Sequence, residues 1–317
     1  MEPPFASAHQ LLRAELDSSG PSPQRLPGWP RPLGREQPDV LQVLRKEFCS
    51  DDLDRMADRL WWMSKQDSRN ISALHRQSVK RRTIIVTEDP KLHLVWIQDR
   101  IFIKPLPRYI TSHTFWRNHL GHGKDSDAET ERLRAQVRKA ALGYLRTYHY
   151  LVRHESDFRI AQDPGLQLIP AGVTWAQFCD FAADLADIPD RDVSTRYSYG
   201  EIRLTRLNFY APIILRKSHF QRVEYQYGSY FARFYGPILF AIGVTSVVLS
   251  GLQVAVEVDK SPPLSAVALW FSVVMILLFC IVLFTLCGMF IYKVVKEWKY
   301  AIRDRLRLME EGRLKPE

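Results

Sequence analysis

Residues Gly236 to Tyr292 read GPILFAIGVTSVVLSGLQVAVEVDKSPPLSAVALWFSVVMILLFCIVLFTLCGMFIY, and this stretch decides the fold of the chain. Its first apolar run, Gly236–Val256, contains 21 residues without a charge, and its second, Ala266–Tyr292, contains 27. As α-helices these runs would be about 32 and 40 Å long, whereas the hydrocarbon core of a bilayer is about 30 Å thick. The sequence therefore predicts two transmembrane helices, 236–256 and 266–292, joined by the short polar turn Glu257–Ser265.

Basic residues lie on both flanks of this hairpin, whereas the turn between its runs offers only Lys260. The residues that we expect at the membrane surface are Arg216, Lys217, Arg222, Arg233, Lys293, Lys296 and Lys299. Because positive charge is retained on the cytoplasmic side of membranes, both termini are predicted to be cytoplasmic. The net charge of the chain is +9, and we expect an anionic cytoplasmic leaflet, rather than nucleic acid, to be its partner. Which membrane this is, and which protein partner the chain has, the sequence does not indicate.

One face of the first run carries small and polar residues at spacings of three and four. The members of this packing seam are Gly236, Gly243, Ser246, Ser250 and Gln253. Small residues let two helices approach closely, and Ser and Gln side chains can hydrogen-bond between helices. We interpret the seam as a contact with the second run, and a polar path through a homo-oligomer is the alternative. Neither run contains the Asp, Glu, Lys or His residue that a proton or ion relay normally uses.

The rest of the chain predicts a cytosolic domain that is mainly helical. Residues 1–38 are rich in Pro, Ser, Gly and Arg, and we expect a disordered tail because so little apolar surface cannot order itself. Residues 39–190 form the predicted helical domain, followed by juxtamembrane and interfacial helices over 191–235 and a basic amphipathic tail over 293–317. The predicted fold class is thus a membrane protein, mainly α with a small antiparallel β element.

The β element is predicted at about 83–104. The runs TIIVT, LHLVWI and RIFIK begin at residues 83, 92 and 100, and Gln98-Asp99 joins the last two as a tight hairpin would. Helices are expected over 108–120, 128–155, 175–188 and 213–235. The third of these opens with Thr174 and Gln177, which match a capping box.

No residue pattern in the chain indicates catalysis. The loop GHGKDS at 121–126 lacks the spacing of a phosphate-binding loop, and His113, His119 and His122 do not complete a tetrahedral metal site. Four cysteines without ligand spacing favour a reducing compartment. We therefore expect no enzyme activity, no cofactor and no metal, and interpret the chain as a membrane-anchored scaffold or interaction protein. Its tryptophans Trp61, Trp62, Trp96 and Trp116 are then core or partner-facing aromatics.

Three blocks of sequence carry a family resemblance. They begin DRLWWMSKQDSRNISALHRQ at residue 58, RYSYGEIRLTRLN at residue 196 and YGSYFARFYGPILF at residue 227. In these blocks the chain resembles a filamentous-fungal family of uncharacterised integral membrane proteins that carry a domain of unknown function. The resemblance covers roughly residue 39 to the end of the second run, and it implies two spans and a cytosolic N-terminal domain but no activity.

A second resemblance concerns layout alone. Divalent-cation channels of the CorA type also place an N-terminal α/β domain before two C-terminal spans. They need a Gly-Met-Asn signature after the first span, where this chain has Ser250-Gly251-Leu252-Gln253. An oligomeric channel or transporter is therefore the alternative interpretation, and it lacks the filter.

Overall fold

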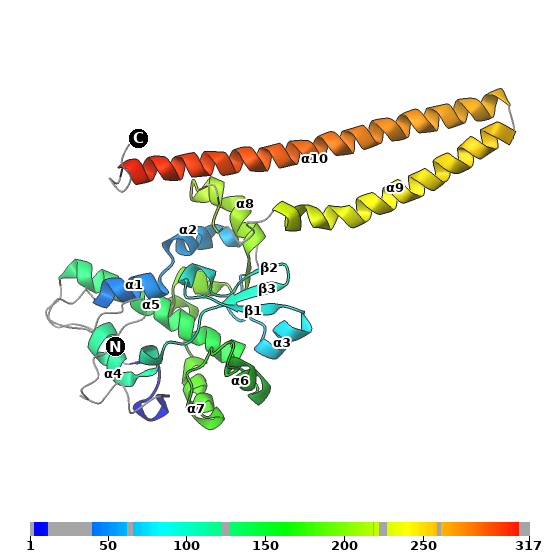
Figure 1. The fold of residues 1–317 in the computed structure, drawn as a ribbon. Coiled ribbons are helices and arrows are strands. Elements are labelled where there is room, and N and C mark those ends of the chain that lie inside the picture. The colour runs from blue at the N-terminus through cyan, green and yellow to red at the C-terminus, as the bar shows by residue number, and fades with distance from the viewer. Residues whose placement is uncertain are drawn as a thin grey trace. The chain divides into compact units, whose positions relative to one another are not determined.

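The computed structural model describes residues 3–11, 40–61, 66–121, 127–217, 219–221, 227–258 and 261–310. The chain divides into two compact units, Met1–Gln221 and Arg222–Glu317. The first unit is mostly helical with a small mixed sheet, and the second consists of two long helices (Figure 1).

The helices described in the first unit include short 3₁₀ or π turns, written η. They are η1 (Ser7–His9), α1 (Val40–Phe48), α2 (Asp51–Leu60), α3 (Leu74–Val79), η2 (Pro90–Leu92), η3 (Arg108–Thr111), α4 (His113–Phe115), η4 (Trp116–Leu120), α5 (Ala128–Leu151), α6 (Glu155–Ala161), α7 (Trp175–Leu185), η5 (Asp190–Asp192), η6 (Thr195–Ser198) and α8 (Leu204–Ile214). The strands are β1 (Thr83–Val86), β2 (Val95–Ile97), β3 (Arg100–Ile103) and β4 (Ile202–Arg203). The second unit contains α9 (Tyr227–Val258) and α10 (Pro262–Glu310).

The sheet is mixed, so the prediction of a purely antiparallel element is wrong. The strand order is β1-β3-β2-β4, and only β2 and β3 are antiparallel. They form the expected tight hairpin, in which Gln98 takes a positive φ of 52°. β1 pairs in parallel with β3, because η2 carries the chain past the hairpin before β2 begins. β4, from a segment predicted to be helical, pairs in parallel with β2 and completes the sheet.

The long helix α5 lies at the centre of the core, where it packs against α1 and α7 (Figure 1). The predicted helices over 128–155 and 175–188 are confirmed as α5 and α7, each slightly shorter than expected. The hydroxyl of Thr174 accepts from the backbone of Gln177, whose side chain accepts from the backbone of Thr174, as in the predicted capping box.

Part of the predicted N-terminal tail belongs to this core. Phe5 and Leu11 are buried in it, and the ring of Phe5 lies 4.9 Å from that of Phe181 on α7. The backbone of Ala6 and the ring of His9 both bond to Asp184. The prediction of disorder is therefore wrong for residues 3–11, because the composition of the long tail concealed two well-placed apolar side chains. The tail between residues 12 and 39 lies outside the described residues.

Two further helix predictions need correction. The segment 108–120 is broken into η3, α4 and η4, because the hydroxyl of Ser112 caps a new helix by accepting from the backbone of Phe115. The helix predicted over 213–235 is not continuous. α8 runs through Pro212 and ends at Ile214, and Arg216 has a positive φ of 55°. Phe220, which lies within the predicted interfacial range 191–235, is instead buried in the first unit.

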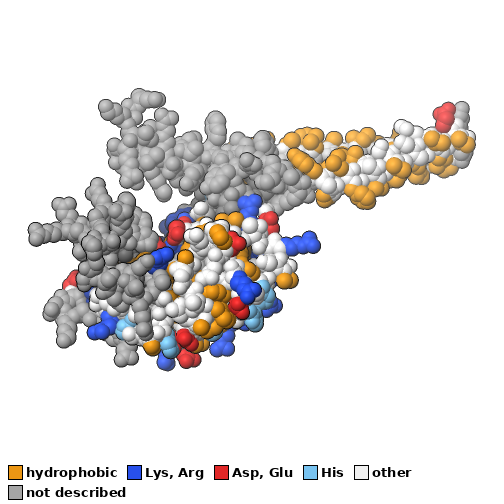
Figure 2. Space-filling view, turned by 60° about the horizontal axis from the view of Figure 1, so that its bottom comes forward, with side chains coloured by type: hydrophobic (Ala, Val, Ile, Leu, Met, Phe, Trp, Pro, Cys, Tyr) orange, Lys and Arg blue, Asp and Glu red, His pale blue; other side chains and the backbone are white. Residues whose placement is uncertain are grey.

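The second unit contains two helices long and apolar enough to cross a membrane, Tyr235–Val258 and Pro262–Met289. In the most apolar 18-residue window of each, 6% and 0% of the residues are buried. Figure 2 shows hydrophobic side chains over the described surface of this unit. Pro262 and Pro263 open α10, where the first turn has no need of their missing N–H groups. α10 continues without interruption to Glu310, beyond the predicted end of the span at Tyr292.

The packing seam does not face the second helix, which corrects the interpretation of it as an internal contact. Its five members, Gly236, Gly243, Ser246, Ser250 and Gln253, are all exposed. A Cβ atom added at either glycine would meet nothing within 4 Å. The less exposed positions of α9 that repeat at three and four are instead Ile238, Thr245, Leu249, Leu252 and Val256. This face, which includes the buried Thr245, is thus the one turned toward α10, and the seam lies on an outer face.

Candidate functional site

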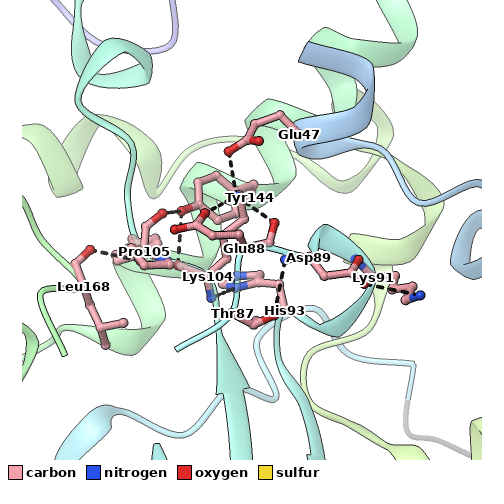
Figure 3. Close-up of polar contacts among 11 residues, drawn as sticks. Glu47, Thr87, Glu88, Asp89, Lys91, His93, Lys104, Pro105, Tyr144 and Leu168 are labelled. Atoms are coloured by element: carbon pink, nitrogen blue, oxygen red, sulfur yellow. Dashed lines mark hydrogen bonds and ion pairs between the residues drawn. The ribbon is translucent and has the colours of Figure 1, made fainter. Parts of the chain in front are cut away.

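A group of polar side chains surrounds the buried Lys104, directly after β3, and all of its members except Glu47 and Glu88 are buried. We call it the Lys104 cluster; its members are Glu47, Glu88, His93, Lys104, Tyr144, Thr147 and Tyr148. Figure 3 shows Glu47, Glu88, His93, Lys104 and Tyr144 among them. Glu47 comes from α1 and Glu88 from the loop after β1, whereas the last three residues come from α5. The cluster therefore ties the sheet to two helices that lie far apart in the sequence.

The ammonium group of Lys104 is fully enclosed. Its side chain is 0% exposed, and Nζ lies 2.6 Å from Oε1 of Glu47, 2.9 Å from Oε2 of Glu88 and 3.0 Å from the carbonyl oxygen of Glu88. An ammonium group has three N–H donors, and here three acceptors surround it. Each N–H group of Lys104 therefore has an acceptor within the protein, and its enclosed Nζ is out of reach of a substrate.

His93 is buried and held in one tautomer. The backbone N–H of Lys104 donates to Nδ1 of His93 over 3.1 Å, so Nδ1 carries no proton. Nε2 then donates to Oγ1 of Thr147 over 2.9 Å, and this hydroxyl donates to the carbonyl of Tyr144. Burial, with added repulsion from Arg196 and Lys104, lowers the pKa of His93 well below its usual value. The imidazole is neutral, and both of its nitrogens are already used.

The pKa values of carboxyl and phenol groups around Lys104 are also shifted. Burial raises the pKa of Glu47, although the ammonium of Lys104 opposes this shift. Burial raises the pKa of Tyr144 as well, and its hydroxyl lies 2.6 Å from the carbonyl oxygen of Pro105. The hydroxyl of Tyr109 is the one buried side-chain N or O atom in the described residues without a hydrogen-bond partner. The raised pKa of Tyr144 keeps its phenol neutral and unreactive.

Two other buried ions fasten the C-terminal segment of the first unit to its core. The guanidinium of Arg196 donates to the carbonyls of Tyr199, Gly200 and His93, and burial lowers its pKa to about 10, so it stays charged at neutral pH. Glu201 accepts a 2.6 Å bond from Arg82, whose guanidinium carbon lies 4.1 Å from the centre of the Trp96 ring. These contacts hold β4 against β2.

The polar groups of the Lys104 cluster bond to one another and to the backbone, as groups that stabilise a fold do. The cluster contains an acid, a base and phenols, but its lysine and histidine are enclosed and hydrogen-bonded within the protein. General acid–base catalysis needs a group within hydrogen-bond reach of a substrate, and an enclosed, fully bonded group does not meet that condition. Among the described residues no group of three His, Cys, Asp or Glu side chains is placed to hold a metal ion.

The predicted surface basic residues are only partly described. Arg216 is exposed, and Nζ of Lys217 lies 2.6 Å from Oδ2 of Asp52 in α2. Arg222 lies outside the described residues. The other four are placed by backbone alone, in α9 for Arg233 and in α10 for Lys293, Lys296 and Lys299.

The four singled-out tryptophans differ in environment. Trp116 is buried and donates a 2.7 Å hydrogen bond to the carbonyl of Ile110, Trp96 is half-buried and Trp61 is exposed. Trp62 lies outside the described residues.

Sequence reasoning missed the Lys104 cluster. The only local signal was a lysine ending the apolar run Ile101-Phe102-Ile103, directly before Pro105. Its carboxylate partners lie 57 and 16 residues away in the sequence, at no recognisable spacing.

The model of one protein family, described as a family of unknown function (DUF6601), matches residues 40–279. The match includes nearly all of the described first unit and continues into α10. No curated protein and no solved structure matches the chain.

Proposed function

Since the chain belongs to this family of unknown function, we propose its role from the physical character of its two units. The proposal is a two-span integral membrane protein with both termini in the cytoplasm, whose first unit serves as a non-enzymatic scaffold or interaction module. The partner on the lipid side is the anionic cytoplasmic leaflet.

The exposed hairpin carries this proposal. α9 and α10 present apolar side chains over windows in which 6% and 0% of residues are buried, and soluble proteins rarely expose contiguous apolar surface of that size. In a bilayer these apolar side chains contact lipid instead of water. The helices are also suited to lipid because every backbone N–H and C=O within a helix is bonded internally. The excess of Lys and Arg outside the turn supports cytoplasmic termini.

A scaffold role for the first unit is supported by the chemistry of the Lys104 cluster. Its charged and polar groups form hydrogen bonds within the protein, and these bonds fix the relative positions of α1, α5 and the sheet. A rigid unit held on a membrane is suited to presenting a surface to another protein.

Thiol accessibility tests the topology with the full chain in sealed membrane vesicles. In the unaltered chain, the exposed Cys179 on α7 marks the first unit. In a second protein that lacks the natural cysteines, Ser261→Cys marks the turn. A membrane-impermeant maleimide should label the two positions from opposite sides, and carbonate at high pH should not extract the protein. Labelling of both from the same side would exclude the two-span arrangement.

A homo-oligomer, with or without a conducting path, is the second candidate. It is favoured by the outward position of Ser246, Ser250 and Gln253, since polar side chains facing lipid are stabilised by partners on another helix. Mass measurement of the full chain in nanodiscs tests it. A monomer, together with no ion flux in proteoliposomes, would dispose of this candidate.

A further inference from the structure

α8 has one face in the first unit and an opposite face that nothing in the described structure covers. Leu204, Leu207 and Ala211 are buried where the helix packs against β2 and β4. On the other side Phe209 and Ile213 are each 68% exposed, and Pro212 between them is also exposed. At 3.6 residues per turn these three side chains form one continuous apolar ridge.

Positive charge borders this ridge. Arg206 lies on the same helical face, and Arg203 and Arg216 lie just beyond the two ends of α8; all three are exposed. None of the three forms an ion pair with a carboxylate of the described residues, although Arg203 lies 5.1 Å from the centre of the Trp96 ring. An apolar ridge with basic borders is the surface that lies in the headgroup layer of an anionic membrane.

A short connection links α8 to the hairpin. The side chain of Asn208 accepts from the backbone N–H groups of Phe220 and Gln221 and donates to the carbonyl of Gln221, so the exit of the first unit is fastened to α8. α9 begins six residues after Gln221, at Tyr227. Six residues of fully extended chain reach about 21 Å at most, so the length of the connection permits α8 to lie at the membrane surface that α9 enters.

We infer that the exposed face of α8 docks on the cytoplasmic leaflet of the membrane that α9 and α10 cross. Phe209 and Ile213 enter the boundary between headgroups and acyl chains, and Arg206 and Arg216 meet anionic headgroups. The inference rests on the proposed function, and within the predicted interfacial range 191–235 it assigns the membrane-surface helix to Leu204–Ile214. Docking would hold the first unit in one orientation on the bilayer.

Lipid-borne quenchers test the docking in the full chain, reconstituted in nanodiscs of phosphatidylcholine and phosphatidylserine with a doxyl-labelled lipid. A bimane label is attached to single cysteines in a variant lacking the natural ones. Ile213→Cys reports on α8, Val247→Cys on the lipid-facing surface of α9, and Val79→Cys, an exposed apolar position at the end of α3, is the matched control. We expect the doxyl lipid to quench positions 213 and 247, and aqueous iodide to quench position 79.

The outcomes separate this inference from the proposed function. Quenching at 247 but not at 213, with 213 open to iodide, would overturn the docking and leave the two spans intact. Protection of 213 from both quenchers would overturn it in favour of a protein occupant, such as a second copy of the chain. Absence of lipid quenching at 247 would overturn both the spans and the docking.

Charge variants give a second, independent measure. Each juxtamembrane guanidinium is worth about 1 kcal/mol on an anionic surface, or roughly a fivefold change in the docking equilibrium. Arg206→Gln and Arg216→Gln should therefore each reduce lipid quenching at 213, and phosphatidylcholine alone should reduce it further. Arg191→Gln on η5, also exposed, is the control and should leave quenching unchanged. Equal quenching in all variants and lipids would contradict a charge-assisted contact.

Discussion

At the scale of single residues, the enclosed ammonium of Lys104 compensates a carboxylate that is itself largely removed from water. The side chain of Glu47 is 14% exposed, whereas that of Glu88 is 72% exposed and can be solvated. Lys104→Met should therefore lower the free energy of unfolding by about 3–5 kcal/mol, because it leaves Glu47 buried and unpaired. Urea denaturation of the full chain in detergent, followed by tryptophan fluorescence, measures this change.

Two variants control for the loss of Lys104. Lys91→Met removes a half-buried lysine that lies 3.3 Å from Asp89, and it should cost less than about 1 kcal/mol. Adding Glu47→Gln to Lys104→Met should restore part of the lost stability, because the stranded charge disappears. A double variant no more stable than Lys104→Met would show that this charge is not the cause.

The neutral imidazole of His93 makes stability depend on pH. The pKa of His93 is lowered in the folded protein from a usual value of 6.5. Below pH 6.5 the imidazole therefore binds a proton in the unfolded chain but stays neutral in the folded chain. Stability should thus be full above pH 6.5 and fall by about 1 kcal/mol on going to pH 5.5. Asp157 and Glu201, whose pKa values are lowered from 3.8 and 4.5, lose their stabilising contribution only at more acidic pH.

Glu47, whose pKa is raised by burial, acts in the opposite sense because the folded protein binds its proton more readily, so variants are needed to isolate the histidine contribution. His93→Gln should flatten the dependence between pH 6.5 and 5.5, whatever its effect on overall stability. His119, whose pKa burial also lowers, is only partly buried, so His119→Gln should flatten it less. An unchanged slope in His93→Gln would rule out His93 as its source.

At the scale of elements, Gly143 allows α5 and η6 to touch. A Cβ atom at this position would lie 2.2 Å from Cδ2 of Tyr197, a buried ring that has little room to move. Gly143→Ala should destabilise the first unit by about 1–3 kcal/mol, despite the better helix propensity of alanine. The control is Gly243→Ala in α9, where a Cβ atom meets nothing within 4 Å, and it should leave urea denaturation unchanged.

The elements also show which features the sequence can reveal. α5 and α7 follow from apolar periodicity, and α7 begins at a capping box whose two bonds are both present. The β2–β3 hairpin follows from two adjacent apolar runs. β4 could not be foreseen, because two residues carry too little pattern and their partner strand lies over 100 residues earlier. The Lys104 cluster was missed for the same reason, since the fold alone brings its charges together.

At the scale of the whole molecule, the length of α10 exceeds what a bilayer can enclose. Its 49 residues span about 74 Å, against a hydrocarbon core of about 30 Å. The sequence predicts a separate basic amphipathic tail over 293–317, but the helix is uninterrupted to Glu310. Under the proposed topology, the end of α10 should stand clear of the membrane. A bimane label at Leu306→Cys should then escape doxyl-lipid quenching, and one at the exposed Cys280 should not. Quenching at both positions would indicate a tail on the surface.

The placement of β4 also has a consequence for biosynthesis. Residues 202–203 complete the sheet by pairing with β2, yet they leave the ribosome long after the strand they join. Until then, the nascent chain exposes the edge of β2, and an unpaired strand edge invites association with other chains. Any shortened product that stops before Ile202 would keep that edge open permanently, so such a product should aggregate instead of accumulating as a folded, soluble fragment.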